Sequence, residues 1–377
     1  MIYALREDNL LHKVKTTCCG SPRELPKSLK KGTSITQAKT IIGDIPVVAG
    51  GISYAYKHNQ YNREKNTITI SASGANAGFI NFWREKIFAS DCTTIREKSN
   101  IDIVFIFNFL KTIQADIFLL ARGSAQPHVY PDDIKNIKIP VPPMEIQQTI
   151  VRECEAVDAE YEKAKQVITD GQQTISSTIE QVYRARHSQV EIGKLAIDVQ
   201  YGISQAMNTT KIGYKIFRMN EIFNNRMTDT GDMKYVDISA EEFQKYRLNK
   251  SDILFNRTNS IEWVGKTGIF ELDGDYCFAS YLIRVVIDTA KAEPYFVNAM
   301  MNSATFQTEA KANAARAINQ ANINASKMKA IKIPVPPLDE QQRIVAEITV
   351  LEQKIKAAQA VMDGATARKA AIVKKHL

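Results

Sequence analysis

The sequence of 377 residues has no apolar run long enough to cross a membrane and no apolar stretch at its start. The segment from Ile101 to Leu110 is among the longest apolar runs, yet it has only about half of the ~20 residues that a membrane-spanning helix needs. Charged residues such as Arg6 and Glu7 lie where a signal peptide would have its apolar region. We therefore expect a cytoplasmic protein that has no membrane partner.

Cysteine and histidine are scarce and dispersed. The five histidines are isolated from one another, and no two cysteines have the CxxC spacing of a zinc site. We expect reduced thiols, in the core or on the surface, and no metal site. The cysteines are Cys18, Cys19, Cys92, Cys154 and Cys277.

Motifs of the common enzyme classes are also missing. The chain has no GxxxxGK[ST], GxSxG or HExxH, and no Asn-Pro-Pro-aromatic tetrad of an adenine methyltransferase. SGANAG at Ser73 to Gly78 has glycines but not the spacing of a phosphate loop, so we predict a turn there. PDDIK at Pro131 to Lys135 is similar to a nuclease cluster, but its counterpart at Asn324 to Lys329 lacks carboxylates. We therefore predict a non-catalytic chain.

Charge is unevenly distributed along a chain whose formal net charge is +8. Residues 1–136, here called the first head, carry 18 basic and 12 acidic side chains. Residues 191–330, the second head, carry 17 and 16. A basic balance favours an anionic partner, so if both heads bind one, the second must do so with locally placed charge.

An internal repeat is the most informative feature of the sequence. IKIPVPPMEIQQTIV at Ile137–Val151 recurs as IKIPVPPLDEQQRIV at Ile331–Val345, with eleven of fifteen positions identical. Weaker correspondences precede each copy, so the repeated unit is a whole head followed by its junction. They pair Lys31–Val48 with Tyr201–Phe217, Thr67–Phe82 with Asp252–Phe270, Phe88–Ile95 with Phe278–Val285, and Gln126 with Gln320.

Each copy of the repeat predicts a strand followed by a long helix. The alternating apolar residues are typical of a strand, and two prolines end the pairing and pre-set φ for a turn. Acidic residues then follow in the first helical turn, where the macrodipole favours them. A helix of about 40 residues spans roughly 60 Å, close to two turns of B-DNA at ~34 Å each.

Both predicted helices carry apolar or small residues at alternating steps of three and four, which is a heptad seam. One such seam could belong to the core of a globular domain. Two equivalent seams without another partner favour two antiparallel helices packed on each other. The seams are Ile150, Cys154, Val157, Tyr161, Ala164, Ile168 and Gly171, and Ile344, Ile348, Leu351, Ile355, Ala358, Met362 and Ala365.

Within the heads, short apolar or alternating runs separated by Gly and Asn predict strands, and two longer apolar segments predict helices. Each head is therefore mixed α/β or α+β. The expected strands are Ile45–Val48, Thr67–Ser71, Ile216–Met219, Ile253–Asn256 and Ile283–Ile287, and the expected helices are Ile103–Ile113 and Tyr295–Ala310.

The tandem junctions IPVPPMEIQQTI and IPVPPLDEQQRI, with their head, helix, head, helix order, resemble the specificity subunit of Type I restriction and modification systems. The resemblance covers essentially the whole chain, and DILFNRTNSIEWVGKTGIF is similar to a stretch of many target-recognition domains in that family. One position departs from the family pattern, since Ile146 stands where the second copy has the acidic Glu340.

The resemblance implies an α+β fold with two similar target-recognition domains, separated by two long antiparallel coiled-coil helices in a pseudo-twofold repeat. Each head would read one half of a bipartite site in double-stranded DNA, and the helices would set the spacing. The expected domains are target-recognition domain 1 (1–136), junction strand and spacer helix 1 (137–190), target-recognition domain 2 (191–330), and junction strand and spacer helix 2 (331–377).

The resemblance also implies partners. Two adenine methyltransferase subunits would dock on the helices, and restriction subunits with motor and nuclease activity would join through them. S-adenosylmethionine, ATP and magnesium are expected in those partners and none of them in this chain. The helix and partner interface is expected at Ile150, Val157, Tyr161, Ile344, Ile348, Leu351 and Ile355.

Candidate DNA contacts lie in or beside the polar loops that flank predicted strands. Arg pairs with guanine and Asn with adenine, while Lys reaches phosphate. The alternative is that these are ordinary solvated loop residues, or, for the tyrosine, a packing residue. The candidates are Lys57, His58, Ser73 and Asn76 in the first head, and Tyr201, Asn220, Arg257, Thr258, Asn259 and Lys266 in the second.

Two other functions stay open at this point. The chain could be the recognition subunit of a Type II system whose partner fuses nuclease and methyltransferase, which the sequence does not separate from a Type I subunit. It could also be a coiled-coil scaffold without a role in DNA binding, and such a scaffold would show no salt-sensitive DNA binding.

Overall fold

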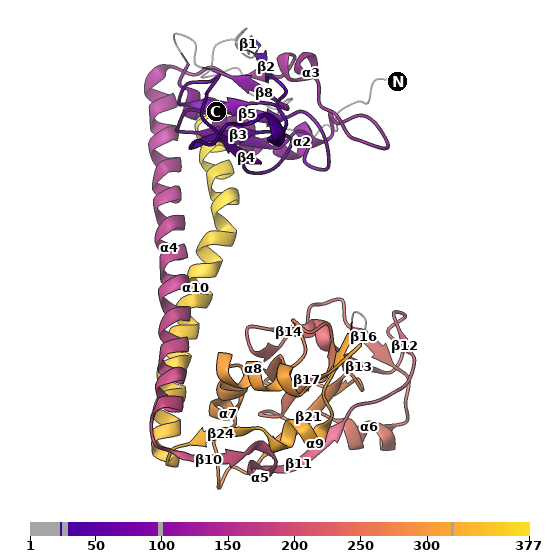
Figure 1. Cartoon of the computed structure of the whole chain (residues 1–377). Coiled ribbons are helices and arrows are strands. Elements are labelled where there is room, and N and C mark those ends of the chain that lie inside the picture. Colours follow the sequence, from indigo (N-terminus) through magenta and orange to yellow (C-terminus); the bar gives the residue numbers. More distant parts are fainter. Residues whose placement is uncertain (1–22, 25–28, 97–100, 318–319) are drawn as a thin grey trace. The chain divides into compact units, whose positions relative to one another are not determined.

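The computed structural model describes residues 23–24, 29–96, 101–317 and 320–377, and it divides into two units (Figure 1). The first unit lies within residues 1–165 and 358–377, and the second is residues 166–357. Each unit therefore contains one head and a portion of each long helix. Cys18 and Cys19 lie outside the described residues.

The first head is built on two small sheets with the strand orders β2-β8-β5-β6 and β4-β3-β7. Helix α1 packs against β5 and β6, and its N-cap Asp102 accepts hydrogen bonds from the N–H groups of Val104 and Phe105. The elements are β1 Arg23–Glu24, β2 Lys30–Lys31, η1 Gln37–Lys39, β3 Ile45–Val48, β4 Tyr56–His58, β5 Thr67–Ser71, β6 Ile80–Trp83, β7 Phe88–Ala89, β8 Cys92–Ile95, α1 Ile103–Thr112, α2 Gln114–Phe118, α3 Pro131–Lys135 and β9 Lys138–Ile139.

The second head has three sheets, with the orders β11-β21-β17-β19-β15-β14, β12-β16-β13-β20 and β18-β23-β22. Its elements are β10 Ser188–Glu191, α5 Ile192–Leu195, β11 Ala196–Tyr201, β12 Met207–Asn208, β13 Tyr214–Phe217, η2 Met219–Glu221, β14 Ile222–Phe223, β15 Arg226–Met227, β16 Lys234–Val236, α6 Ala240–Tyr246, β17 Ile253–Asn256, β18 Thr258–Asn259, β19 Thr267–Ile269, β20 Tyr276–Phe278, β21 Leu282–Ile287, α7 Pro294–Met301, α8 Ala304–Asn313, β22 Ala315–Ala317, β23 Gln320–Asn322, α9 Ala325–Ala330 and β24 Lys332–Val335.

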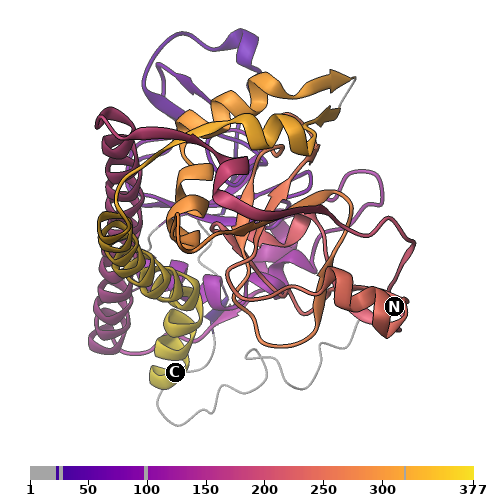
Figure 2. The same cartoon turned by 90° about the horizontal axis from the view of Figure 1, so that it is seen from below.

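The two long helices begin directly after the paired prolines, as the repeat predicts. Helix α4 runs from Met144 to Arg184 and α10 from Leu338 to His376, with 41 and 39 residues. In the first unit Glu160 pairs with Arg368 and Glu153 with His376, and in the second Gly171 lies against Ile355. Residue numbers rise along α4 as they fall along α10, so the helices pack antiparallel, and Figures 1 and 2 show them side by side.

The junction strands pair with the strands that enter each head. Strand β9 pairs antiparallel with β1, and β24 pairs antiparallel with β10. In each unit this two-stranded ribbon lies directly before the start of a long helix.

A buried glutamine fastens the start of each long helix to its own head. The Gln147 side chain donates to the Pro142 carbonyl at 2.8 Å and accepts from the Asp102 N–H at 2.8 Å. Gln341 makes the same two bonds, to Pro336 and from the Glu293 N–H, both at 2.8 Å. Both side chains are buried, and Asp102 and Glu293 are the N-caps of α1 and α7. The first glutamine of the QQ pair in each repeat therefore joins two helix starts.

The departure at Ile146 also has a structural reason. Ile146 is partly buried against the core of the first unit, whereas Glu340 lies 3.7 Å from the His187 imidazole in the second. The two junctions share a backbone geometry but differ in what surrounds this position.

Most predicted strands are confirmed, including β3, β5 and β17 with the expected bounds. The strand expected at Ile216–Met219 lies two residues earlier, as β13, because Arg218 begins a 3-10 turn in which Glu221 accepts from the Arg218 N–H. The helix expected at Tyr295–Ala310 is broken into α7 and α8, because the Ser303 hydroxyl caps a new helix by accepting from the Phe306 N–H.

Replacing Gln341 with alanine should lower the free energy of unfolding by about 1–3 kcal/mol, because the N–H of the partly buried Glu293 loses its acceptor. The urea midpoint of the full chain would measure this. The matched control is Gln342→Ala, which removes an exposed glutamine from the next position. Equal midpoints for the two variants would refute the structural role of Gln341.

The three described cysteines should react slowly in the native state. Burial raises the pKa of the Cys92 thiol to about 12, of Cys154 to about 11 and of Cys277 to about 12, so thiolate is scarce at neutral pH. In a chain carrying Cys18→Ser and Cys19→Ser, we expect no fast phase with a disulfide reagent at pH 8. Urea should expose three reactive thiols, and a fast native phase would contradict the burial.

Candidate nucleic-acid interface

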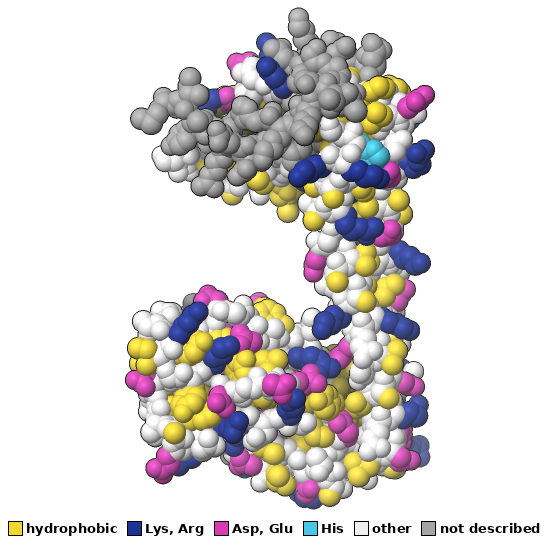
Figure 3. Space-filling model, turned by 180° about the vertical axis from the view of Figure 1, so that it is seen from behind, with side chains coloured by type: hydrophobic (Ala, Val, Ile, Leu, Met, Phe, Trp, Pro, Cys, Tyr) yellow, Lys and Arg dark blue, Asp and Glu magenta, His cyan; other side chains and the backbone are white. Residues whose placement is uncertain are grey.

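In the second head, most candidate residues gather on the segment that follows β17. Arg257, Thr258 and Asn259 begin this segment and Lys266 ends it, while Tyr201 closes β11 and Asn220 lies in η2. Basic, acidic and hydrophobic side chains are interspersed on the face of the second unit in the lower half of Figure 3. This agrees with a head of nearly neutral charge that would bind DNA through particular side chains.

Arg257 is the centre of a polar cluster. Its guanidinium donates to the Ser280 carbonyl at 3.3 Å and to the Asn322 side chain at 3.1 Å, and it lies 5.0 Å from the centre of the Tyr201 ring. Asn322 in turn donates to the Thr258 hydroxyl at 3.0 Å. A guanidinium has five N–H donors, and its Nε here has no hydrogen-bond partner. The cluster therefore orients Arg257 without using all its donors.

Sequence reasoning missed Asn322 in this cluster. One feature of the sequence pointed to this strand, since Gln126 and Gln320 occupy matching positions in the two repeats. Gln320 begins β23, two residues before Asn322. The bridge between Ser73 and His128 in the first head corresponds to the pairing of Thr258 with Asn322 in the second. His128 and Asn322 therefore occupy equivalent positions in the two heads, opposite Ser73 and Thr258.

Asn220, Asn259 and Lys266 surround β14. Asn220 is exposed in η2, and the Asn259 amide lies 2.9 Å from the Met219 sulfur. The Lys266 ammonium donates to the Ile222 carbonyl at 2.7 Å, and burial lowers its pKa. It also lies 4.8 Å from the Trp263 ring and 5.9 Å from the Phe223 ring. Lys266 therefore lies near two aromatic rings, in addition to supplying charge.

In the first head the candidates lie on two different sheets. Ser73 and Asn76 share the turn after β5, where the Ser73 hydroxyl donates to Asp91. Lys57 is exposed on β4 and lies 3.7 Å from Asp44. His58 is only 4% exposed, its Nδ1 lies 3.1 Å from the Ile41 N–H, and its ring packs edge-on against Phe88. The structure therefore places the His58 ring inside the head.

Turns in both heads depend on a glycine in the left-handed region. Gly78 and Gly265 each have φ of +92°. A Cβ on Gly78 would lie 3.0 Å from the Ile117 carbonyl, so this position excludes larger residues. The predicted turn at SGANAG is confirmed.

The predicted seam residues of the two long helices are buried or partly buried. Ile150, Val157, Ile344 and Ile348 are buried, and Tyr161, Leu351 and Ile355 are partly buried. A Cβ on Gly171 would lie 3.0 Å from the Ile355 side chain, so the helices approach closely there. In the first unit, acidic residues of α4 pair with basic residues of α10, and the pairs are Asp158–Lys369, Glu160–Arg368 and Glu153–Lys375.

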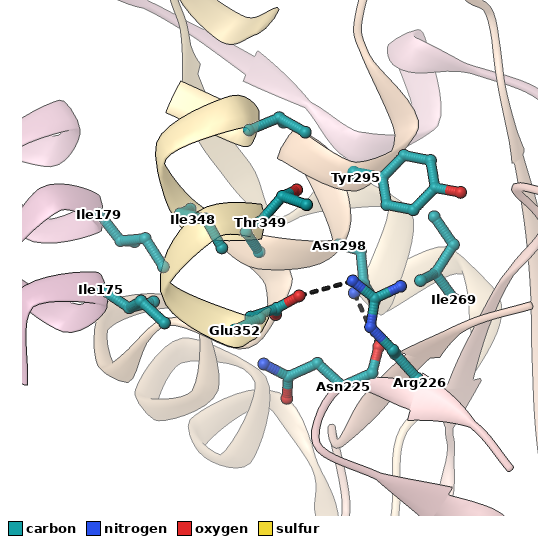
Figure 4. Close-up of a pocket in the computed structure, with 12 residues that line it drawn as sticks. Ile175, Ile179, Asn225, Arg226, Ile269, Tyr295, Asn298, Ile348, Thr349 and Glu352 are labelled. Atoms are coloured by element: carbon teal, nitrogen blue, oxygen red, sulfur yellow. Dashed lines mark hydrogen bonds and ion pairs between the residues drawn. The ribbon is translucent and has the colours of Figure 1, made fainter. Parts of the chain in front are cut away.

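The second head is bound to α10 by an ion-pair network around Arg226 of β15. Figure 4 shows Arg226 reaching Glu352, whose carboxylate lies 2.5 Å from the guanidinium. Arg226 also pairs with Glu271, which accepts from the Tyr295 hydroxyl at 2.9 Å. Ile175 and Ile179 of α4 and Ile348 of α10 line the small cavity beside this network.

Metal and membrane sites are not supported in the described part of the chain. No three His, Cys, Asp or Glu side chains are grouped there to hold an ion. Among the same residues, no helix combines the length and apolar character that crossing a membrane requires.

Comparison with known proteins agrees with this arrangement. The family described as Type I restriction modification DNA specificity domain matches residues 23–170 and 190–361, one region in each copy of the repeat. The chain belongs to this family. The match confirms the predicted family.

Relatives from the specificity-domain family include archaeal and bacterial proteins. The putative type I restriction enzyme MjaX specificity subunit of Methanocaldococcus jannaschii is 36% identical over 148 residues, which cover 39% of this chain and 35% of that protein. The EcoKI specificity subunit of Escherichia coli K12 is 22% identical over 287 residues, 70% of this chain and 61% of that protein. This chain thus spans less than two thirds of these relatives' lengths.

Solved structures of the same family share the fold. The S subunit of a Type I restriction-modification system from M. genitalium aligns with a TM-score of 0.63 at 15% identity, covering 97% of this chain and 98% of that one. A chain from a structure on complex assembly and conformational transition of the type I R-M system aligns with a TM-score of 0.52 at 17% identity, covering 94% and 99%. Together with the family match, these similarities confirm the predicted α+β heads and the packed pair of long helices.

Replacing Ile348 with aspartate should destabilise the second unit by several kcal/mol, on the order of 3, because a carboxylate would be buried in the seam. The control Val350→Asp places the same charge on an exposed position of the same helix, 51% accessible. Urea unfolding of both variants would show whether the loss is confined to the seam. Similar losses for both would argue against this packing.

Proposed function

We propose that this chain is the DNA specificity subunit of a Type I restriction-modification complex, in which each head reads one half of a bipartite site. The family match across both copies of the repeat carries the proposal. The duplicated heads support it, because two readers on one chain suit a site with two separate parts.

The long helices would act as the spacer. The helices have 41 and 39 residues, each about 60 Å long at 1.5 Å per residue, and they would set how many base pairs go unread. The corresponding domain limits are 1–136, 137–190, 191–330 and 331–377. Exposed faces of the same helices would dock two methyltransferase subunits, and the restriction subunits would join through them.

Residue roles follow from side-chain chemistry. Arg257 would pair with guanine, and Asn76, Asn220 and Asn259 with adenine. Lys57 and Lys266 would lie near phosphate, and Ser73, Thr258 and Tyr201 would position their neighbours or contact the backbone. His58 would support the fold of the first head.

The partner subunits would carry out the catalytic reactions. Methyltransferase subunits would bring S-adenosylmethionine, and restriction subunits ATP and magnesium, while this chain contributes recognition only. Its place of action would be the cytoplasm, where the DNA is.

The proposal is tested by binding of the chain, assembled with its methyltransferase partners, to random and genomic duplex DNA. We expect binding that weakens steeply with salt, since phosphate contacts release counterions. We also expect a bipartite adenine-methylated motif when methylation is mapped in cells that express the complex. Absence of both would refute a role in DNA recognition and leave a scaffold.

Arg257→Ala should weaken binding to the full site by about 1–3 kcal/mol and relax one half of the motif only. The control Arg247→Ala removes another arginine of the second head, which is paired with Asp275 at 3.0 Å. Methylation mapping with both variants measures the effect, and an unchanged urea midpoint separates it from unfolding. Equal relaxation of both halves would contradict the assignment of one head to one half-site.

A further inference from the structure

Matching hydrogen bonds surround one turn in each head. These bonds allow the two turns to be aligned residue by residue. In the first head the Gly78 N–H donates to the Ser71 carbonyl at 2.8 Å, and in the second Gly265 donates to Asn256 at 2.8 Å. A glutamine amide from a following helix then donates to each glycine carbonyl. Gln114 does so at 2.9 Å and Gln307 at 2.7 Å.

Neighbouring segments confirm the alignment. The Val129 N–H donates to the Ala72 carbonyl at 3.0 Å, and the Ile323 N–H donates to the Arg257 carbonyl at 2.9 Å. Both glycines have the same φ of +92°. The backbone on either side of the turn is therefore fixed in the same way in both heads.

Inside this common framework the two turns differ in length and chemistry. The first turn is Ser73–Ala77, with only small or amide side chains, and the second is Thr258–Val264, two residues longer. The Asn76 carbonyl accepts from the Phe79 N–H at 2.9 Å, and the Trp263 carbonyl accepts from the Lys266 N–H at 3.3 Å. Asn76 and Trp263 therefore occupy equivalent positions, each followed by a buried residue, Ala77 or Val264.

Trp263 is presented to solvent and does not pack into the core. It is 51% exposed, and its ring centre lies 4.8 Å from the Lys266 ammonium, which also lies 5.9 Å from the ring of Phe223, 48% exposed on β14. Tryptophan is enriched at interfaces, because it combines a large apolar ring with a polar N–H. A cation near two exposed aromatic rings suits a partner that is both anionic and flat, which is the chemistry of DNA.

We infer that Asn76 and Trp263 are equivalent specificity-determining residues of the two heads, Asn76 contacting a base edge through its amide and Trp263 contacting bases through its ring. The inference rests on the proposed function and assigns residues to it. A duplicated protein that reads two different half-sites must differ between its heads somewhere, and the observed difference lies in a turn whose surroundings are the same. An amide makes bidentate bonds with adenine, whereas an indole ring favours apolar contact, such as with a thymine methyl group.

Three variants test the inference in the complex with methyltransferase partners, by mapping the methylated motif. Trp263→Asn should change or relax one half of the motif and lower binding to the wild-type site about tenfold or more. Asn76→Ala should relax the other half. Trp263→Phe, which keeps an aromatic ring, should retain the wild-type motif with weaker binding.

The control is Ile197→Ala, which removes an exposed aliphatic side chain from β11, at the opposite edge of the six-stranded sheet from β14. Its motif should be unchanged, and the urea midpoints of all variants should match the wild type. A wild-type motif in Trp263→Asn, or relaxation of the same half by Trp263→Asn and Asn76→Ala, would overturn the inference alone. A wild-type complex without any motif would instead overturn the proposed function.

Discussion

Two buried glutamines, Gln147 and Gln341, tie each long helix to the head that precedes it. Each side chain bridges a proline carbonyl at the start of the long helix and the N–H of a helix cap in the head. Buried polar groups need hydrogen-bond partners, so moving one helix start away from the other would leave the amide of each glutamine unsatisfied. This bond pattern orients each long helix relative to its head, and both copies of the repeat have it.

Packing then reinforces this direction. Ile150 and Cys154 of α4 and Val373 of α10 belong to the core that contains β5 and α1, whereas Ile179 of α4 and Ile344 of α10 belong to the core of the second head. Arg226 adds an ion pair from β15 to Glu352. The ends of the two long helices are therefore parts of the head cores. The surface loops of the heads can vary without disturbing this packing.

Sequence alone predicted the features that depend on local periodicity. The repeat predicted that a long helix begins after each pair of prolines, and the heptads predicted the seam. Contacts between distant parts of the chain could not be predicted from local periodicity. Such contacts decide whether a polar residue faces solvent. His58 lies in a predicted polar segment, but Phe88, far along the chain, covers its ring. Beside the break that Ser303 caps, the Asn302 side chain bonds to the backbone of Thr267, another contact between distant parts of the chain.

Among the candidate contacts, residue type and loop position located the segment from Arg257 to Lys266 but not the roles inside it. Asn322 and Trp263 became visible only when pairing between strands showed which positions of the two heads are equivalent. The repeat in the heads is too weak in sequence to align a turn whose length differs by two residues. Hydrogen bonds to the flanking glycines supply the missing alignment.

Charge along the helix pair has one further consequence. In the first unit α4 contributes carboxylates and α10 contributes lysine, arginine and histidine, so the last turns of α10 are strongly basic. If two copies of α10 associated in parallel, these basic ends would meet and repel each other. Electrostatics thus disfavours parallel pairing of two α10 helices from different molecules, and favours pairing of the basic end of α10 with the acidic residues of α4 in its own chain.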